Sequence, residues 1–445
     1  MTEKRYDHVE DMLHFIDESP TAYQAVANMK KTLEAAGYTA LSENDDWQLT
    51  PGGRYFVTRN GSSLLAFRLP AGTLKAFRIA AAHSDSPLFK IKAEPEVADS
   101  CYVRLNVEKY GGMLCAPWFD RPLSCAGRLI VKTEEGLRTV LVDAKEPLFV
   151  IPNLAIHMNR EANDGYKINV QKDMLPLYGD ASAKGSFLKK MAFLAGVSAE
   201  AVIGQDLYLY PCEKGIRWGA EGAFISSGRL DDLECVYASL TAFLASDPAE
   251  APDNGLVPIH AIFDNEEVGS STREGAGATF LADTLVRIAE AMGVSAAGYR
   301  RLVAASFMLS ADNAHAVHPA APEKSDPVNR PVMNGGVVIK YNANHRYTTD
   351  GVSAAIFKML CDTCDVPYQT FANRSDMAGG STLGSIASTR VPVRSVDIGL
   401  AQLAMHSPYE TAGAADLESL IRAEKAFFET PFEETEDGCV VMSEA

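Results

Sequence analysis

The stretch LVPIHAIFDNEEVGS, residues 256–270, changes character sharply at its centre. Its first eight residues are almost all apolar, which is typical of a strand buried on both faces of a parallel sheet. The acids Asp264, Glu266 and Glu267 follow at once, and a glycine comes right after them. Neighbouring carboxylates repel each other and are costly to bury, so this strand end predicts a site that compensates negative charge.

The same alternation of apolar strands and amphipathic helices extends along the chain on both sides of this stretch. Further strands are expected at FRIAAAH, LVAASFMLSAD, GGVVIKYN and VPVRSVDIGL. Helical spacing is seen in DDLECVYASLTAFLAS, ADTLVRIAEAMG and GVSAAIFKMLCDTC. This alternation predicts an α/β fold with a mixed, mostly parallel sheet covered by helices.

The middle of the chain has a different pattern. CYVRLNVEKY alternates polar and apolar residues, and GRLIVKTEEGLRTVLVD is typical of a hairpin with its turn at Glu134-Glu135-Gly136. Helical periodicity is scarce there except near SFLKKMAFLAG. We therefore predict a β-rich domain over residues 93–228, inserted into a catalytic domain made of residues 1–92 and 229–445. The acidic tail after Glu433 is expected to be loose.

Composition and charge exclude several classes of function. The 445 residues are 47% hydrophobic and 22% charged, as in a globular protein with a substantial core. A net charge of −17 argues against binding nucleic acid or an anionic membrane. The charged N-terminal stretch lacks the apolar segment of a secretory signal, and no run is long enough to span a bilayer.

The cysteines point to the cytoplasm rather than to a disulfide framework. Eight of them are scattered along a large chain, so the cytoplasm is the expected compartment. The only CxxC, formed by Cys361 and Cys364, lies in a helical pattern and has no second pair. One turn of a core helix is therefore a better interpretation than a zinc knuckle.

Polar residues fall at the expected strand ends. Sites in open α/β sheets form beyond the carboxyl ends of the strands. His83, Asp312 and the Glu266–Glu267 pair each follow such a strand, His406 lies in the loop after another, and Asp231 precedes a helix. Two histidines and several carboxylates in one crevice suit two divalent ions such as zinc, manganese or cobalt. In such a site one of the adjacent glutamates binds metal and the other stays free as a general base.

Each of these residues has a simpler explanation when it is taken alone. A single His at a strand end is more often a hydrogen-bonded structural residue, which applies to His83, and His406 taken alone is a weak signal. Asp231 alone reads as a helix N-terminal acid and Asp312 as a turn residue. Their joint occurrence at strand ends makes the metal hypothesis stronger than any single member does.

The motifs that carry these residues resemble the M18 metallo-aminopeptidases, the aspartyl aminopeptidase family. The matching segments are HSDSP, RLDD, DNEEVGS, SADNAHAVHP, VIKYN, HRYTTD, QLAMHS, YGG…WFDRPLSCAGR and IPNLAIHMNR. The resemblance runs from about residue 8 to about residue 430. It implies a zinc-exopeptidase type of catalytic domain, an inserted β-rich dimerisation domain, and a tetrahedral homododecamer built from dimers.

The resemblance also assigns the metal site. It implies two divalent cations, most simply zinc, with manganese or cobalt as alternatives. The ligands would be His83, Asp231, Glu267, Asp312 and His406, with Asp231 bridging the two ions. Glu266 would be the general base, and Asp85 would orient the imidazole of His83. The family usually has RLDN where this chain has RLDD, so Asp232 places an extra charge beside the bridge, with an effect the sequence leaves open.

The substrate assignments rest on the resemblance as well. The substrate-binding set would be His157, Glu266, Asp312, His315, Lys340 and Tyr347. His157 would reach the active site of a neighbouring subunit and share the oxyanion with Tyr347. The simpler alternatives are a surface lysine for Lys340, a packed aromatic for Tyr347 and a loop-edge residue for His157.

The expected reaction is release of the N-terminal residue of a peptide. Lys340 favours Asp or Glu at that position, with Arg374 as a second possible partner, and a preference for neutral residues is the alternative. Two other functions stay open at this point: an N-acyl amino acid deacylase and a non-enzymatic assembly protein.

Overall fold

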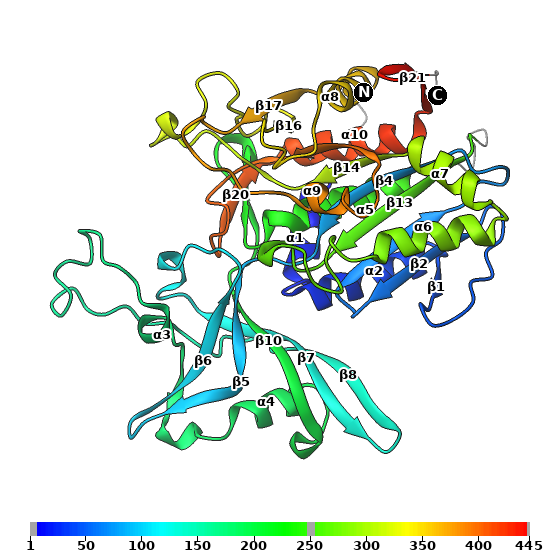
Figure 1. Cartoon of the computed structure of the whole chain (residues 1–445). Helices are drawn as coiled ribbons and strands as arrows, with labels where there is room; N and C mark the ends of the chain where they lie inside the picture. The colour runs from blue at the N-terminus through cyan, green and yellow to red at the C-terminus, as the bar shows by residue number, and fades with distance from the viewer. Residues whose placement is uncertain (1–6, 247–253, 443–445) are drawn as a thin grey trace.

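The computed structural model describes residues 7–246 and 254–442, which form three sheets of more than two strands and one short hairpin. A nine-stranded sheet with its helices makes up the upper body in Figure 1, and a six-stranded sheet lies below it. A smaller five-stranded sheet includes β20 (Glu410–Gly413), at the side of the upper body (Figure 1). The predicted α/β class with a β-rich insertion matches this architecture.

The nine-stranded sheet is mixed but mainly parallel, as predicted. Five of its eight neighbouring pairs are parallel. Strands β4 and β13 are buried along their whole length, which explains their near-continuous apolar sequences. The order across the sheet is β1 (Thr39–Leu41), β2 (Arg54–Arg59), β3 (Ser63–Arg68), β13 (Leu256–Phe263), β4 (Ala76–His83), β14 (Phe307–Ala311), β18 (Arg394–Gly399), β16 (Val337–Tyr341) and β17 (Tyr368–Ala372).

Helices cover both faces of this sheet. Successive side chains of a strand point to opposite faces, and along β4 Ala80 and Ala82 lie in one apolar core while Ile79 and Ala81 lie in the other. The first core includes α1 (Val9–Asp17), α2 (Ala22–Ala35), α5 (Leu230–Ala245), α8 (Gly351–Thr363) and α10 (Asp416–Glu429). The second includes α6 (Phe280–Ala291), α7 (Ala296–Ala304) and α9 (Leu383–Ala387).

The CxxC segment is helical, as predicted. Cys361 is buried in the last turn of α8, and Cys364 is the residue that caps the helix. Within residues 7–246 and 254–442, no helix has both the length and the apolar character needed to cross a membrane.

The six-stranded sheet is antiparallel throughout and has an apolar core of its own. Helix α4 (Phe187–Leu194) packs into this core, and α3 (Val170–Asp173) lies near β6. The predicted hairpin is confirmed, with Thr133 opposite Gly136 across the turn. The order is β8 (Gly136–Asp143), β7 (Leu123–Thr133), β10 (Val202–Pro211), β5 (Leu88–Ala98), β6 (Tyr102–Tyr110) and β9 (Leu177–Asp180).

The strand pairing differs from the predicted domain boundaries at residues 93 and 228. Strand β5 already begins at Leu88. At the other end, β11 (Ile216–Trp218) and β12 (Phe224–Ser227) pair with β20 rather than with the six-stranded sheet. The division into two domains stays a prediction, and the pairing favours boundaries near residues 88 and 211.

The five-stranded sheet has no counterpart in the sequence prediction. Its strands are only two to four residues long, which is too short for an alternating pattern to be recognised. Its order is β11, β12, β20, β19 (Ala401–Leu403) and β15 (Ala314–His315).

The expectation of a loose tail after Glu433 is wrong for the part of the tail that the structure describes. Strands β21 (Phe432–Glu436) and β22 (Cys439–Met442) form a hairpin. Arg394 pairs with Glu434 at 2.9 Å, and Arg78 donates to the backbone oxygen of Phe432, also at 2.9 Å. Residues 443–445 lie outside the described residues.

One buried acid on α10 predicts how stability depends on pH. Glu424 is 0% exposed, and neither of its carboxylate oxygens has a hydrogen-bond partner among the described residues. Burial raises the pKa of Glu424 well above its ordinary value. The folded protein therefore keeps a proton that the unfolded chain releases, and this contribution to stability is lost as the pH rises toward the folded pKa. The loss amounts to at most about 1.4 kcal/mol per pH unit.

Glu424→Gln should therefore melt at a higher temperature than wild type at pH 8, with a smaller difference at pH 5. Glutamine has nearly the same shape but no charge to desolvate. Scanning calorimetry at both values tests this, with Glu418→Gln on the same helix as the matched control. An equal difference in melting temperature at the two pH values would contradict the prediction.

Candidate metal and active site

Three neighbouring parallel strands carry the predicted ligands at their carboxyl ends. β13 pairs with β4, and β4 pairs with β14, all in parallel. His83 is the last residue of β4, Asp312 follows β14, and Glu266 and Glu267 form a 3₁₀ turn just after β13. Because these ends meet at one edge of the sheet, the three segments converge on one place, as expected.

Asp231 lies between the two histidines. Its Oδ1 atom is 3.4 Å from Nε2 of His83, and its Oδ2 atom is 3.5 Å from Nε2 of His406. Nε2 of His406 is also 3.3 Å from Oε2 of Glu267. Each oxygen of Asp231 therefore faces a different histidine.

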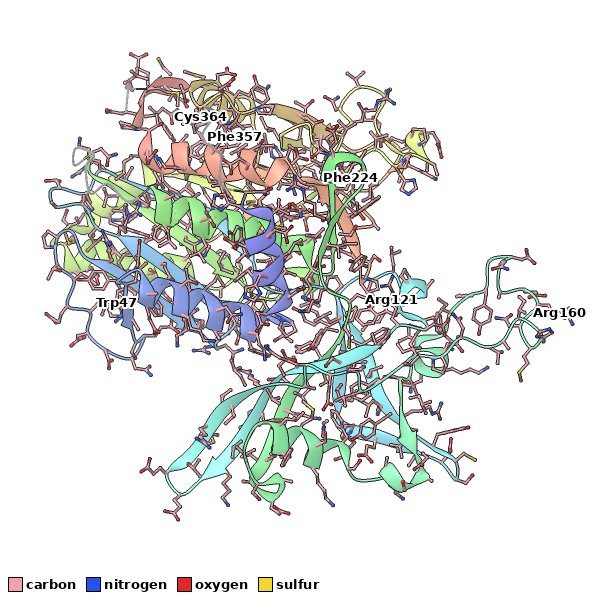
Figure 2. The ribbon with its side chains drawn as sticks, turned by 180° about the vertical axis from the view of Figure 1, so that it is seen from behind. Trp47, Arg121, Arg160, Phe224, Phe357 and Cys364 are labelled. Atoms are coloured by element: carbon pink, nitrogen blue, oxygen red, sulfur yellow. The ribbon has the colours of Figure 1, made fainter. Side chains whose placement is uncertain are left out.

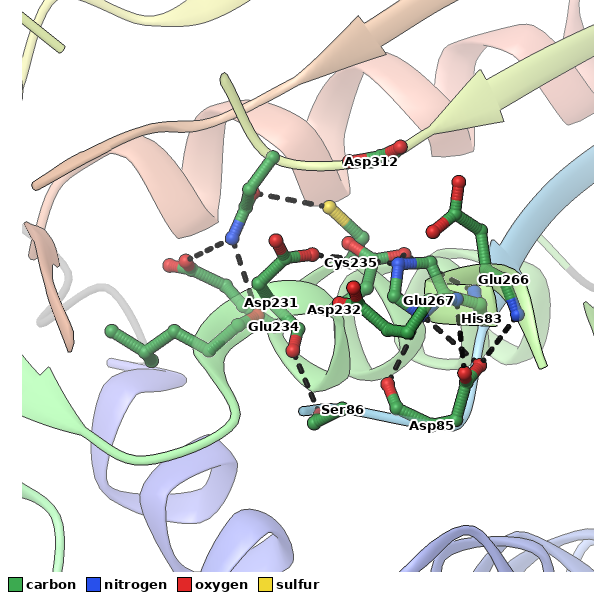
Figure 3. Close-up of polar contacts among 12 residues, drawn as sticks. His83, Asp85, Ser86, Asp231, Asp232, Glu234, Cys235, Glu266, Glu267 and Asp312 are labelled. Carbon is green, nitrogen blue, oxygen red and sulfur yellow. Dashed lines mark hydrogen bonds and ion pairs between the residues drawn. The ribbon is translucent and has the colours of Figure 1, made fainter. Parts of the chain in front are cut away.

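The side chains that could hold metal ions form three overlapping groups, each with ligand atoms within 4.8 Å of one another. The close-up in Figure 3 shows Asp231, Asp232, Glu266 and Glu267 gathered around His83. The groups contain His83, Asp231, Asp232 and Asp312; His83, Glu266 and Glu267; and Asp231, Glu267 and His406.

The electrostatics of the cluster favour bound cations. Burial raises the pKa of Glu267 to about 7, even though His406 opposes the shift. Burial alone would lower the pKa of His406, but Asp231 and Glu267 raise it to about 11. Burial likewise opposes charge on Asp231, yet the two histidines hold its pKa below the usual value. The buried carboxylates thus make a bound positive charge favourable at this cluster.

Buried oxygens without a hydrogen-bond partner also favour bound cations at this site. Oδ1 of Asp231, Oε1 of Glu267 and Oδ1 of Asp232 have no hydrogen-bond partner among the residues that the structure describes. Buried polar atoms without a partner are rare and costly. Coordination to a divalent cation would satisfy them, and carboxylate and imidazole donors are ligands that zinc accepts. The residues present therefore fit a metal site.

Backbone and second-layer contacts hold the ligands in place. The backbone oxygen of Asp85 is 3.0 Å from Nδ1 of His83, and its Oδ1 atom is 3.4 Å from the same nitrogen. Asp85 therefore lies within reach of the ring, and its orienting role stays a prediction. Ser86 donates its hydroxyl to the backbone oxygen of Asp231 at 2.8 Å (Figure 3).

Two supporting residues escaped the sequence prediction. Glu410 is 1% exposed and accepts the backbone N–H groups of Asp231 at 3.0 Å and His406 at 2.7 Å. Tyr110, from β6, donates its hydroxyl to Oδ2 of Asp85 at 2.6 Å. Neither residue lies in a periodic pattern that marks a site. The bonds of Glu410 to Asp231 and of Tyr110 to Asp85 join segments far apart in the chain.

Asp232 is completely buried next to Asp231 in the chain. Its Oδ2 atom accepts the backbone N–H of His83 at 3.1 Å, as the amide oxygen of an asparagine also could. Burial raises the pKa of Asp232 well above its ordinary value. The departure from RLDN therefore keeps this hydrogen bond while adding a carboxyl group to the cluster.

A cavity of about 320 Å³ opens next to the cluster. His315, Lys340 and Tyr347 line it together with Glu266 and the five predicted ligands. Nζ of Lys340 is buried and donates to the backbone oxygens of Asp312 at 2.7 Å and Asn313 at 3.2 Å. Lys340 is thus not a surface lysine, and part of its hydrogen-bonding capacity braces the Asp312 segment.

Two predicted substrate residues lie away from the cavity of this chain. His157 is exposed on the long loop that carries Arg160, which projects from the molecule in Figure 2. Arg374 is bound by Asp376 through two bonds of 2.9 and 2.7 Å and does not line the cavity. The structure of one chain therefore brings neither residue to the metal cluster.

Comparison with known proteins agrees with this geometry. The family described as aminopeptidase I zinc metalloprotease (M18) matches residues 15–428. A probable M18 family aminopeptidase 2 from Clostridium acetobutylicum is 45% identical over 414 residues, covering 91% of this chain and 94% of the relative. A protein of the same description from Pseudomonas aeruginosa is 41% identical over 425 residues, covering 94% of this chain and 97% of the relative.

Solved structures show the same fold. The structure of the Ape4 and Nbr1 complex contains a chain with a TM-score of 0.92 and 35% identity, covering 94% of this chain and 85% of that one. The S. cerevisiae mApe1 dodecamer has a TM-score of 0.83 and 28% identity, covering 95% of this chain and 96% of that one. The family match over nearly the whole chain and the identity to its relatives lead to one conclusion: this chain belongs to the M18 family of zinc metallo-aminopeptidases.

Proposed function

We propose that this aminopeptidase works with two divalent cations, bridged by Asp231, and prefers peptides that begin with an acidic residue. The observation that carries the dinuclear site is the placement of Asp231, whose two oxygens face His83 and His406 separately. His83 and Asp312 would hold one cation, and Glu267 and His406 the other. Zinc is the simplest choice because the family is one of zinc enzymes, with manganese and cobalt as alternatives.

Metal analysis of the purified protein tests this site. Two cations per chain are expected by mass spectrometry of metal-saturated protein. Removal of the metals by a chelator should abolish peptide hydrolysis, and zinc should restore it. One cation per chain at saturation would contradict the bridging role of Asp231.

Glu266 fits the role of general base. It follows β13 beside Glu267, lines the cavity, and has a carboxylate oxygen within 4.8 Å of a ligand atom of His83. Burial raises the pKa of Glu266 well above its ordinary value, so the group can hold a proton between steps. Bound cations supply Lewis-acid polarisation of the scissile carbonyl and acidify the attacking water. Glu266 takes the proton from that water and delivers it to the departing amine.

Two donors would hold the oxyanion that develops on the scissile carbonyl. Tyr347 lines the cavity, and because burial raises the pKa of Tyr347 its hydroxyl keeps the proton that it donates. His157 would supply the second donor to a neighbouring subunit, since its exposed loop projects away from its own chain (Figure 2). The dodecamer of the S. cerevisiae relative supports a homo-oligomer here, which we propose to be a tetrahedral dodecamer of dimers.

Lys340 is the basis of the acidic preference. Burial opposes its charge, but Asp312 and nearby groups raise its pKa, so the ammonium group stays charged. It lines the cavity, where a carboxylate of the first residue of a peptide would meet it. Peptides that differ only in their first residue, Asp, Glu, Leu or Ala, give the preference directly. N-acetylated copies of the same peptides should not be cleaved, and cleavage of these alone would indicate a deacylase.

Lys340→Met should reduce kcat/KM for Asp-peptides relative to Leu-peptides by about 10–100-fold, the value of one hydrogen bond to a charged group. The ratio within one variant cancels any general loss of activity, which matters because Lys340 also braces Asp312. Arg374→Met is the matched control, because Arg374 is paired with Asp376 away from the cavity. An unchanged Asp-to-Leu ratio in Lys340→Met would remove Lys340 from the specificity site.

A further inference from the structure

The end of β6 in the six-stranded sheet lies directly against the metal cluster of the nine-stranded body. Tyr110 is the last residue of this strand, and its hydroxyl donates to Oδ2 of Asp85 at 2.6 Å. The same hydroxyl accepts a hydrogen bond from Nδ2 of Asn265 at 2.8 Å. One phenol therefore joins the loop after β4 to the loop after β13.

The carboxylate that accepts from Tyr110 also binds the backbone of the two glutamates. Its Oδ1 atom accepts the backbone N–H of Glu266 at 3.1 Å, and its Oδ2 atom accepts that of Glu267 at 3.2 Å. Figure 3 shows both bonds converging on the carboxylate of Asp85. The side chain of Asp85 therefore fixes the backbone of the turn that carries both glutamates, and Tyr110 in turn fixes Asp85.

The residues after Tyr110 pack against the second half of the cluster. A Cβ atom at Gly111 would lie 3.0 Å from Cβ of Glu267, and the φ of +75° at Gly111 is one that glycine adopts without strain. A Cβ atom at Gly112 would lie 3.8 Å from Nδ1 of His406. The backbone N–H of Leu114 donates to the backbone oxygen of His406 at 3.1 Å. Segment 110–114 thus contacts Glu267, His406 and Asp85.

The chemistry of Tyr110 suits a fixed donor. Its side chain is only partly accessible, and burial together with Asp85 raises the pKa of Tyr110 far above the ordinary value. The phenol therefore keeps its proton at neutral pH, where it presents a donor to Asp85. A phenylalanine would fill the same space and leave Oδ2 of Asp85 without this donor.

We propose that Tyr110 is a positioning residue, which acts through Asp85 to hold the Glu266–Glu267 turn in the geometry needed for metal binding and proton transfer. The six-stranded sheet is then a structural part of the active site as well as a separate layer of the molecule. This inference rests on the proposed dinuclear function, in which Glu267 is a metal ligand and Glu266 is the general base.

The test compares Tyr110→Phe with wild type in cobalt-loaded protein. Contacts that support metal ligands typically change affinity or activity by about 10–100-fold. Tyr110→Phe should therefore bind Co²⁺ at least about tenfold more weakly and change its visible absorption spectrum. With saturating Co²⁺, kcat should also fall at least about tenfold while KM stays within about twofold. The control is Tyr102→Phe, at the 55% exposed start of the same strand.

A second variant covers the case in which Tyr110→Phe does not fold. Asn265→Gly keeps the left-handed backbone at φ 62° and removes the amide that donates to Tyr110, so it should shift Co²⁺ affinity in the same direction. Wild-type affinity and spectrum in the folded variants would overturn the proposal. Co²⁺ binding and its spectrum are measured without turnover, so a wrong assignment of Glu266 as the base would not alter these outcomes.

Discussion

Glu266→Gln should lower kcat by about 10²–10⁴-fold and leave both cations bound, because general-base catalysis contributes about that much. Glutamine keeps the shape of the side chain and its place in the turn after β13, but it cannot accept the proton of the attacking water. Asp85 holds this turn through backbone N–H groups, which the substitution does not touch. Ground-state binding should therefore be preserved, and the loss should appear in kcat rather than in KM.

Steady-state kinetics and metal analysis of the same preparation measure the two effects together. Glu274→Gln is a suitable control, because the backbone oxygen of Glu274 accepts from Ser63 and Asp264 near this turn and the substitution leaves that backbone unchanged. Glu267→Gln is the informative contrast, since a lost ligand should lower metal content before it lowers the rate at saturating metal. A Glu266→Gln enzyme with full activity would show that another group moves the proton.

The position of the metal cluster could be predicted because local patterns set it. β4, β13 and β14 are each marked by a near-continuous apolar run with a polar residue at its end or just after it. Sites in open α/β sheets form beyond the carboxyl ends of the strands, and this rule places His83, Glu267 and Asp312 at one edge of the sheet. The positions of His406 and Asp231 were harder to predict. His406 lies between two very short strands, and Asp231 lies at the start of a helix. Their places after a strand and before a helix made these two residues candidates, and the family resemblance then assigned them as ligands.

The contacts that hold the site together were not predictable in the same way. Glu410 bonds to Asp231 and Tyr110 bonds to Asp85, both of which are distant in sequence, and one sequence carries no signal for such pairs. The five-stranded sheet was missed for a related reason, because strands of two to four residues are stabilised by their neighbours rather than by their own pattern. Strand β5 begins at Leu88 and pairs with β6 and β10 of the six-stranded sheet, so the strand pairing favours a boundary before residue 93, and the division into domains stays a prediction.

Lys340 shows where a functional and a structural explanation overlap. The sequence left a surface lysine and a substrate residue as alternatives, and burial with two backbone acceptors excludes the first. Its contact with the backbone of Asp312 adds a role that neither alternative contained. Lys340 therefore braces the segment that carries Asp312 and also lines the cavity.

Asp231→Asn should reduce metal content from two cations per chain to at most one, because an asparagine offers a single ligand oxygen where the carboxylate offers two. In the structure each oxygen of Asp231 faces a different histidine, so the substitution removes one side of the bridge and not only a charge. Lewis-acid assistance is worth several kcal/mol, and each ~1.4 kcal/mol is a factor of ten, so kcat/KM should fall by roughly a thousandfold or more.

Asp232→Asn is the matched control, because the same chemical change is made one residue further along the chain. The amide oxygen of an asparagine can still accept the backbone N–H of His83, the bond that Oδ2 of Asp232 accepts now. This variant should therefore keep two cations per chain. Metal analysis at saturating and limiting zinc distinguishes the two variants. Two tightly bound cations in Asp231→Asn would mean that the ions do not share Asp231, and equal losses in both variants would mean that the cluster responds to its total charge rather than to a bridging ligand.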